Sequence, residues 1–208
     1  MLQEKIELIN RLKSKGITNE RILNAIKSVP REKFVSEKSK SLAYTDIALP
    51  IKSGQTISQP FIVARMLELL ELESTDKILE IGSGSGYAAA LMSLLGGKVI
   101  GVDKDEDLVK SSKELLRNLG YKNIKILRGD GSKGYPPYHP YQKILVSGAL
   151  PEIPEALINQ LDHLGVLVAP VGDRMHQKIV KLKKVGKQIT KEVHEHCIFL
   201  PIRGEYGF

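Results

Sequence analysis

The stretch from Lys77 to Asp103, KILEIGSGSGYAAALMSLLGGKVIGVD, constrains the possible folds more than any other part of this sequence. It begins with a short apolar run that contains Glu80 and leads directly into three glycines at alternate positions. The segment Tyr87 to Leu95, rich in Ala and Leu, favours a helix, and a second apolar run ends on Asp103. This order of strand, glycine turn, helix, strand and acid predicts one βαβ unit of a nucleotide-binding type of fold.

The spacing of the glycines indicates the class of ligand. In Gly82-Ser83-Gly84-Ser85-Gly86, the third glycine of the dinucleotide fingerprint is replaced by Tyr87, so that fingerprint is absent. An acid before a G-x-G-x-G turn, with a second acid ending the next strand, resembles the S-adenosylmethionine (SAM) site of Rossmann-like methyltransferases. Helix N-terminal N–H groups suit the methionine carboxylate, and Asp103 is placed to accept both ribose hydroxyls. The alternative is a ligand-free turn in which Ser83 and Ser85 only cap the helix.

The composition is that of an ordinary globular protein. Its 208 residues suit one domain, and 42% hydrophobic with 26% charged residues is usual for a soluble chain. No apolar run approaches the length of a membrane span, and the N-terminal residues alternate charged and apolar side chains, unlike a signal peptide. A single cysteine, Cys197, excludes an internal disulfide. We therefore expect a cytoplasmic protein without a membrane partner.

The chain carries a formal net charge of +7, and much of the excess lies in the lysine-rich segment 178–191. Its lysines alternate with apolar residues around Val185-Gly186, as in an exposed hairpin. This pattern has two interpretations, a nucleic-acid-binding patch or a solvated strand whose lysines protect a sheet edge. Because no aromatic residue is interleaved to stack on bases, we expect no stable nucleic-acid partner.

The remaining segments alternate between helical and strand patterns. Helices are expected at residues 2–15, 18–29, 60–70, 105–119 and 154–161, and strands at residues 78–81, 99–102, 124–127, 141–147, 166–171, 178–184 and 188–201. The order predicts an α/β, Rossmann-like fold with a doubly wound, mostly parallel sheet, an antiparallel C-terminal hairpin and a small N-terminal helical layer. We expect one domain, residues 1–208, made of the helical layer (1–45), a substrate loop (46–60) and the Rossmann-like core (61–208).

The expected substrate loop, DIALPIKSGQTISQP, directly precedes an amphipathic helix. Ser58 lies two residues before Pro60, an ordinary arrangement for capping a helix, so a purely structural role for this serine stays open. Long irregular segments beside a ligand-binding fold are often functional, which favours a role for Ser58 in the chemistry.

Two further groups have both functional and structural interpretations. Asp130 lies between two glycines just past a strand end, where α/β folds bind ligands, but the same residue also suits a plain turn. His194, His196 and Cys197 are close in sequence. On a strand, however, the cysteine faces away from both histidines, so we expect no metal site.

From Tyr44 to the C-terminus the chain resembles the protein-L-isoaspartate (D-aspartate) O-methyltransferase family. The matching pieces are DIALPIKSGQTISQPFIVARM, ILEIGSGSGY, RGDG at 128–131, ALPEIPEALINQL at 149–161 and GVLVAPVGD at 165–173. The stretch GQTISQP is the most specific, because methyltransferases in general lack it. The resemblance implies methyl transfer from SAM to the free α-carboxylate of L-isoaspartyl, and also D-aspartyl, residues of damaged proteins and peptides. Repair then proceeds through a succinimide.

The resemblance also implies roles for individual residues. Ser58 matches the catalytic position. The positions that bind the cofactor are matched by Glu80, Gly82, Ser83, Gly84, Gly86, Asp103, Lys104, Asp130 and Gly131. The positions that border the substrate are matched by Gln55, Thr56, Ile57, Ala149, Leu150, Pro151 and Arg203. Arg203 stands where other members have threonine, so the role of the C-terminal tail stays open. Leu150 stands where many members have alanine, which either tightens the pocket or has no effect.

Two other functions agree with part of the sequence. A basic methyltransferase acting on RNA or another acceptor would share the SAM turn, but the chain has no Asn-Pro-Pro-Tyr motif and no cysteine placed to act on a base. A non-catalytic SAM-binding protein is the other possibility. The retained polar serine in GQTISQP argues against it.

Overall fold

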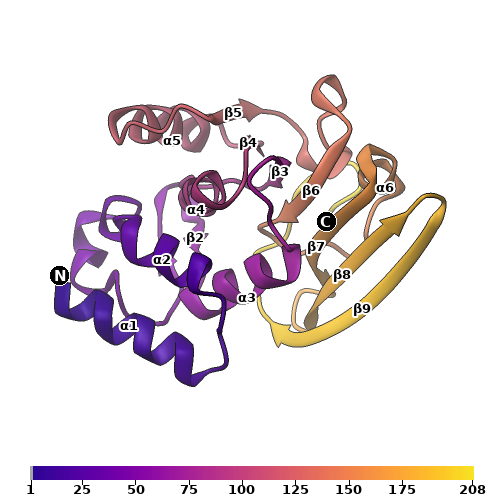
Figure 1. Cartoon of the computed structure of the whole chain (residues 1–208). Helices are drawn as coiled ribbons and strands as arrows, with labels where there is room; N and C mark the ends of the chain where they lie inside the picture. The colour runs from indigo at the N-terminus through magenta and orange to yellow at the C-terminus, as the bar shows by residue number, and fades with distance from the viewer. Residues whose placement is uncertain (1) are drawn as a thin grey trace.

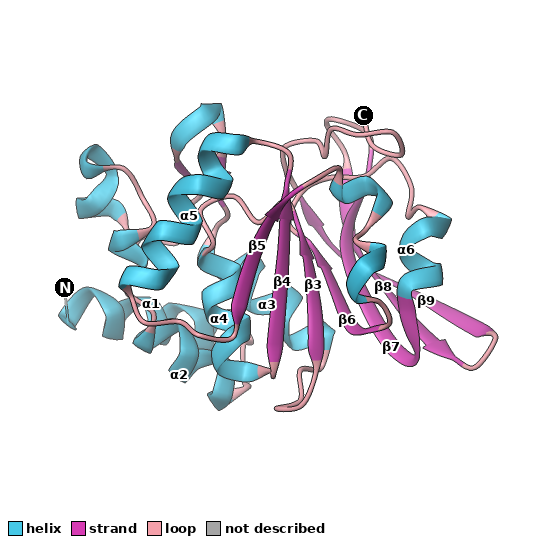
Figure 2. Ribbon diagram, turned by 90° about the horizontal axis from the view of Figure 1, so that it is seen from above, coloured by secondary structure: helices cyan, strands magenta, loops and turns pink. Residues whose placement is uncertain are grey.

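In the computed structural model, which describes residues 2–208, seven strands form one sheet in the order β5-β4-β3-β6-β7-β8-β9 (Figures 1 and 2). The strands are β3 (Lys77–Ile81), β4 (Lys98–Asp103), β5 (Ile124–Arg128), β6 (Tyr141–Val146), β7 (Leu161–Gly172), β8 (Gln177–Val185) and β9 (Gln188–Cys197). Strands β3 to β7 are parallel, whereas β8 and β9 run antiparallel to their neighbours. The predicted mostly parallel sheet with a C-terminal hairpin is confirmed.

Six α-helices accompany the sheet within residues 2–208, and they are α1 (Leu2–Ser14), α2 (Glu20–Ser28), α3 (Pro60–Leu70), α4 (Tyr87–Leu95), α5 (Glu106–Asn118) and α6 (Glu155–Gln160). Asn19 caps the N-terminus of α2, since its Oδ1 accepts a hydrogen bond from Arg21 N at 3.0 Å. The connection from β5 to β6 contains only short 3-10 turns, at Gly131–Lys133 and Pro136–Tyr138. Prolines in this connection lack the N–H groups that a longer helix requires.

Both faces of the sheet are covered, which explains why its central strands are nearly all apolar. Successive side chains of β3 point to opposite faces, so Ile78 joins one hydrophobic core and Leu79 joins the other. The first core contains residues of helices α1 to α5. The second core is closed by α6 and by the turns between β5 and β6. Glu80 points to the first face, and it is therefore a polar residue in an apolar position.

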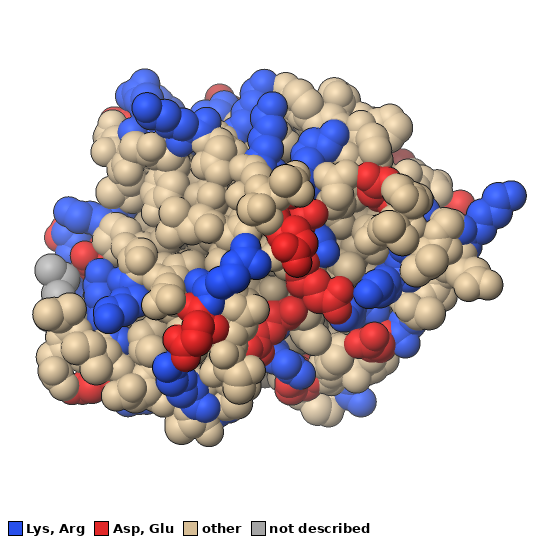
Figure 3. All heavy atoms as spheres, in the orientation of Figure 1, with Lys and Arg blue, Asp and Glu red and all other residues tan. Residues whose placement is uncertain are grey.

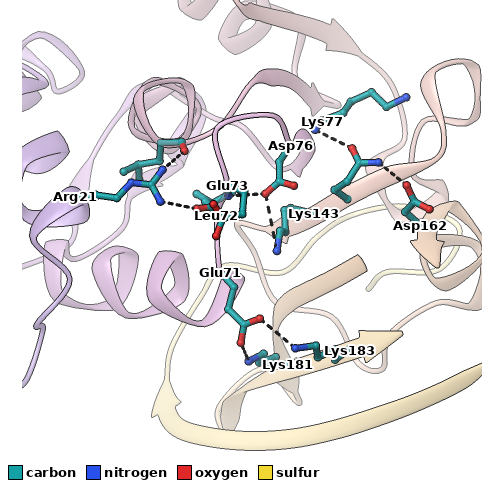
Figure 4. Close-up of polar contacts among 12 residues, drawn as sticks. Arg21, Glu71, Leu72, Glu73, Asp76, Lys77, Lys143, Asp162, Lys181 and Lys183 are labelled. Carbon is teal, nitrogen blue, oxygen red and sulfur yellow. Dashed lines mark hydrogen bonds and ion pairs between the residues drawn. The ribbon is translucent and has the colours of Figure 1, made fainter. Parts of the chain in front are cut away.

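The predicted N-terminal helical layer shares the first core with the sheet. Leu8 and Leu12 of α1 are buried in this core. Arg21 of α2 fastens the layer to the rest of the protein (Figure 4). Its Nη1 donates to the carbonyl oxygen of Leu72 at 2.9 Å, and its Nη2 donates to that of Leu95 at 2.7 Å. The layer thus shares one hydrophobic core with the sheet.

Lysines of the C-terminal hairpin contact acidic and carbonyl groups of the protein itself. Lys181 Nζ lies 2.5 Å from Glu71 Oε1, and Lys183 Nζ lies 3.4 Å from Oε2 of the same carboxylate (Figure 4). Lys184 Nζ donates to the backbone oxygens of Ile158 and Leu161 at 3.1 and 2.8 Å. These contacts attach β8 to the end of α3 and to α6, so at least three of the lysines have a structural role.

Charged side chains of both signs are mixed on the face shown in Figure 3. Lys and Arg side chains are scattered over this face, and several Asp and Glu side chains lie among them near its centre. This face therefore carries no continuous basic patch of the kind that tracks a nucleic-acid backbone. Within residues 2–208, no helix has the length and apolar character that are required to cross a membrane.

Candidate active site

The glycine turn between β3 and α4 has a backbone that glycine adopts far more readily than other residues. Its three φ values are 74°, 50° and 85°, at Gly82, Gly84 and Gly86. Gly82 N donates to Val102 O at 2.8 Å, which holds the turn against the end of β4. A Cβ atom on Gly86 would lie 2.9 Å from Leu116 Cδ1, so a larger residue there would also require the Leu116 side chain to shift.

Glu80 lies behind this turn, and its side chain is buried with 1% of its surface exposed. Ser147 Oγ donates to Glu80 Oε1 at 2.9 Å, whereas Oε2 forms no hydrogen bond within residues 2–208. Burial raises the pKa of this carboxyl to about 8, the hydrogen bond from Ser147 opposes the shift, and the charge of Asp103 adds to it. A buried carboxyl with an unused oxygen is suited to a ligand that brings a hydrogen-bond donor or a positive charge.

Ser83 follows the first glycine of the turn and is also buried. Its Oγ has no hydrogen-bond partner in the described part of the chain. α4 receives no hydrogen bond from a side-chain cap, so the alternative in which Ser83 and Ser85 only cap this helix is wrong. Ser83, Glu80 and Ser58 line one small cavity of about 40 Å³.

Asp103 ends β4, and its carboxylate is oriented by backbone N–H groups on two sides. Gly84 N donates to Oδ2 at 2.8 Å, and Asp105 N donates to Oδ1 at 3.0 Å. Each carboxylate oxygen has a further lone pair, so the group can still accept from a neighbouring pair of hydroxyls. The position therefore fits the predicted contact with a ribose diol.

Asp130 is used differently from Asp103, because its carboxylate binds the C-terminal tail. Ser132 donates to Oδ1 from its backbone N at 3.1 Å and from its Oγ at 2.6 Å. Glu205 N donates to Oδ2 at 2.9 Å. Partial burial acts to raise the pKa of Asp130, but these hydrogen bonds outweigh it and hold the pKa below its usual value. Asp130 thus fastens residues 201–208 across the end of β5, next to Gly131.

A cavity of about 460 Å³ opens at the C-terminal ends of β3, β4 and β6, where α/β folds place their ligands. Nine residues that the sequence identified line it, and these are Gln55, Thr56, Ser58, Gly82, Gly84, Asp103, Lys104, Gly131 and Arg203. Glu80, Ser83 and Ile57 line the small cavity beside it. Gly86, Asp130, Ala149, Leu150 and Pro151 line neither cavity. Leu150 is fully buried in the second core, so it does not narrow the cavity directly.

Ser58 lies just before α3, in a loop that also contains the short strands β1 (Leu49–Pro50) and β2 (Thr56–Ile57). α3 begins at Pro60, and neither Ser58 nor Gln59 caps it with a side chain. Asp46 caps this helix instead, because its Oδ1 accepts a hydrogen bond from Phe61 N at 2.8 Å. The capping interpretation of Ser58 is therefore wrong, and its Oγ forms no hydrogen bond within residues 2–208.

Arg31 holds the backbone of Ser58 in place. This arginine is fully buried, and its Nη2 donates to Ser58 O at 3.0 Å. Its Nε donates to Ala43 O at 2.9 Å, and its guanidinium lies over the ring of Tyr87 with 4.9 Å to the ring centroid. Burial lowers the pKa of Arg31, and the neighbouring phenol of Tyr87 opposes the shift. The N-terminal layer and the glycine-turn helix therefore jointly position the serine.

Sequence reasoning did not find several residues of the site. Phe199 and Leu200 belong to one wall of the larger cavity, and they reach it because the next residue, Pro201, pairs with Ala149. These side chains are ordinary apolar residues without a motif, and no local pattern indicates what they face. Arg31 and Asp46 were also missed, although a buried arginine has to find hydrogen-bond partners and often organises a site.

The observed residues fit SAM. The glycine turn admits a ligand close to its backbone, and the Asp103 carboxylate is available to a diol. The unpaired Glu80 Oε2 and Ser83 Oγ are aimed at the adjoining small cavity, where an ammonium and a carboxylate of a bound amino acid would satisfy them. A volume of about 460 Å³ lies in the range of roughly 300–1,000 Å³ that is usual for small-molecule sites. Within residues 2–208, no group of three or more His, Cys, Asp and Glu side chains is placed to hold a metal ion.

Comparison with known sequences identifies relatives along nearly the whole chain. The model of the family described as protein-L-isoaspartate(D-aspartate) O-methyltransferase (PCMT) matches residues 3–207. The protein-L-isoaspartate O-methyltransferase of Methanoculleus marisnigri is 45% identical over 208 residues, which cover 99% of this chain and 94% of the relative. The enzyme of the same name from Dictyoglomus thermophilum is 42% identical over 202 residues, covering 97% and 92%.

Solved structures give the same result. A protein-L-isoaspartate O-methyltransferase superposes with a TM-score of 0.88 and 29% identity, covering 97% of this chain and 67% of that chain. A putative protein-L-isoaspartate O-methyltransferase from Plasmodium falciparum, in complex with S-adenosyl-L-homocysteine, has a TM-score of 0.80 and 25% identity, covering 95% and 97%. The predicted methyltransferase fold is confirmed, and the chain belongs to the protein-L-isoaspartate(D-aspartate) O-methyltransferase family.

Proposed function

We propose that this protein transfers the methyl group of SAM to the free α-carboxylate of L-isoaspartyl residues, and also of D-aspartyl residues, in damaged proteins and peptides. Membership of the family supports this reaction. The observation that carries it is the position of Ser58, which lines both the cofactor cavity and a second, open groove. A carboxylate bound at this junction faces the cofactor on one side and solvent on the other. That arrangement suits an acceptor that is part of a large protein.

The acceptor requires no strong base from the protein. An α-carboxyl group has a pKa of about 3.5, so near neutral pH it is already an anion and a nucleophile. SAM, when bound, supplies a methyl group on a positively charged sulfur. The protein therefore has to align the carboxylate with this group rather than remove a proton, and alignment of this kind can lower a barrier by about 7–11 kcal/mol.

We assign to Ser58 the task of donating a hydrogen bond to the acceptor carboxylate and directing one of its oxygens at the methyl group. Its hydroxyl is available and its backbone is held by Arg31, so little reorganisation is needed. We propose that SAM is held by Glu80, Gly82, Ser83, Gly84, Asp103, Lys104 and Gly131, with Gly86 and Asp130 supporting them. We propose that the acceptor is bordered by Gln55, Thr56, Ile57 and Arg203. Ala149, Leu150 and Pro151 lie behind the cavity wall that the C-terminal segment forms.

The proposal is tested by transfer of labelled methyl from SAM to three acceptors in parallel. These are an isoaspartyl peptide, its normal aspartyl twin and bulk RNA. We expect label in the isoaspartyl peptide alone, because the normal aspartyl residue presents a β-carboxylate on a different backbone. Label in RNA without label in the peptide would refute the proposal in favour of an RNA methyltransferase.

The role of Ser58 is tested separately with Ser58→Ala, and Ser41→Ala at an exposed site serves as the matched control. We expect Ser58→Ala to lower kcat while the affinity for SAM changes little, because the hydroxyl contacts the acceptor and not the cofactor. A collapse of SAM affinity with intact turnover at saturating SAM would show instead that Ser58 binds the cofactor.

We further propose that the chain acts in the cytoplasm as one domain. Its single cysteine is free and buried, which agrees with a reducing compartment. The helical layer of residues 1–45 shares a core with residues 61–208, and it supports the loop of residues 46–60 through Arg31. The three parts therefore contribute to one site.

A further inference from the structure

A second groove of about 540 Å³ begins at Ser58 and leads away from the cofactor cavity. One wall is formed by the loop around Ile47 and by the start of α3, and the other by the turn between β7 and β8 and by the end of β9. The groove shares Thr56, Ser58 and Phe199 with the cofactor cavity, so the two spaces meet at the proposed catalytic serine. A molecule that lies in the groove can therefore extend as far as Ser58, where one of its groups can react.

Large apolar side chains are exposed on both walls of this groove. Met175 has 73% and Ile198 80% of its surface exposed on one side, and Ile47 has 42% exposed on the other. Single exposed apolar residues are common, but three around one opening indicate a contact surface. Covering them would remove apolar area from water, which is favourable for any partner that fits.

The two most exposed residues are held on rigid backbone. Asp173 Oδ1 accepts hydrogen bonds from Met175 N and His176 N, both at 2.7 Å, and this fixes the turn that presents Met175. Beside Ile198, the buried side-chain amide of Gln177 accepts from Phe199 N at 2.7 Å and donates to Phe199 O at 3.2 Å. A preorganised apolar surface loses little conformational entropy when it is covered.

The groove offers no unpaired carboxylate or ammonium to a charged ligand. Asp46 is the one Asp, Glu, Lys or Arg among the described residues that line it. Its carboxylate is already paired, with Lys15 Nζ at 2.6 Å and Phe61 N at 2.8 Å. The walls therefore combine exposed apolar side chains with hydrogen-bonding side chains such as Gln59, His176 and His196, as a polypeptide-binding surface does.

We propose that this groove binds the stretch of the acceptor polypeptide that flanks the isoaspartyl residue on one side, and that it favours apolar side chains there. The inference rests on the proposed function, because the polypeptide is the molecule that has to pass Ser58. A second copy of the chain seated in the groove would close the access to Ser58. The acceptor is therefore the occupant that agrees with both the position of the groove and the apolar side chains exposed on its walls.

The test uses isoaspartyl peptides of equal length that carry two leucines or two serines on either side of the isoaspartyl residue. Wild-type protein is compared with the double variant Met175→Ser, Ile198→Ser. A second double variant, Val193→Ser, Leu164→Ser, removes exposed apolar side chains outside the groove and is the matched control. KM and kcat are measured for each peptide, and peptide Kd is measured with S-adenosylhomocysteine present.

We expect wild type and control to show a KM and a Kd about tenfold lower for leucines on one of the two sides, which corresponds to partial burial of two apolar side chains. The groove variant should lose this preference while its kcat is unchanged. Equal values for the leucine and serine peptides in wild type, or a preference that survives in the groove variant, would overturn the inference.

Two further outcomes separate this inference from its premises. Failure of wild type to methylate any isoaspartyl peptide would refute the proposed function. The Kd comparison would still decide on its own whether the groove binds flanking residues. Sedimentation that shows a dimer dissociated by the groove variant, and not by the control, would assign the groove to a second copy of the chain and would also overturn the inference.

Discussion

Replacement of Glu80 by glutamine should stabilise this protein in a pH-dependent way. The ordinary pKa of the carboxyl is 4.5, and burial raises it to about 8 in the folded protein. The folded state therefore keeps a proton that the unfolded state releases between these two pH values. Stability associated with the protonated carboxyl is fully present below pH 4.5, is lost as pH rises towards 8, and stays lost above it.

The size of the effect follows from these two values. At pH 7 the unfolded carboxyl is about 2.5 pH units above its ordinary pKa, while the folded one is still mostly protonated. Each pH unit between the two pKa values lowers the unfolding free energy by about 1.4 kcal/mol. At pH 7 the wild-type protein is therefore about 3 kcal/mol less stable than a protein with a neutral side chain at this position. The glutamine side chain of the variant is neutral at every pH. Its amide oxygen can still accept a hydrogen bond from Ser147.

The assay is urea unfolding of wild type and Glu80→Gln at pH 5, 6 and 7. We expect the difference in unfolding free energy to grow by about 1.4 kcal/mol per pH unit, in favour of the variant. Glu114→Gln, at an exposed site on α5, removes the same charge and is the control. A constant difference across the three pH values would refute the argument, because it would mean that Glu80 has the same pKa in both states.

Three other predictions follow from the same geometry. Asp103→Asn should raise the Kd for SAM by about tenfold to a hundredfold in a calorimetric titration, through a lost charged hydrogen-bond pair, and an unchanged Kd would exclude the diol contact. Gly86→Ala should lower the unfolding free energy by about 1–2 kcal/mol in urea, because φ is 85° and the Leu116 side chain has to shift, and full stability would contradict that backbone constraint. Burial raises the pKa of Cys197 to about 11, so its thiol should react with a disulfide reagent at pH 8 only after unfolding, and rapid reaction of the native protein would contradict its burial.

Local sequence was sufficient for helices α1 to α6, for strands β3 to β9 and for the cofactor turn, but not for the short strands β1 and β2. Strand and helix patterns repeat over a few residues, and the need for glycine at positive φ is a property of single residues, so both can be recognised from neighbours in the chain. The lysine segment shows the limit of such patterns. Alternation correctly predicted the hairpin of β8 and β9, but the pairing of Lys181 and Lys183 with Glu71 depends on residues more than a hundred positions away.

Tertiary structure alone decided how the site residues are used. Ser58 precedes a helix as a cap would, yet Asp46 supplies the hydrogen bond to that helix and leaves the serine hydroxyl without a partner in the described part of the chain. Asp130 follows a strand as a ligand-binding acid would, yet its oxygens hold Ser132 and the tail at Glu205. A sequence records which groups a residue carries, whereas the partners of those groups are set by segments that meet only after folding.

The same division applies to the stretch from β3 to Asp103. Its sequence determined the turn, the helix and the acid at the strand end, because these depend on local backbone preferences. Packing determined that Glu80 is buried with one unpaired oxygen and a pKa of about 8. Packing also determined that the cavity is completed by residues 199–203, from the far end of the chain. Desolvation and long-range contacts have no local signature, so only the folded structure fixes them.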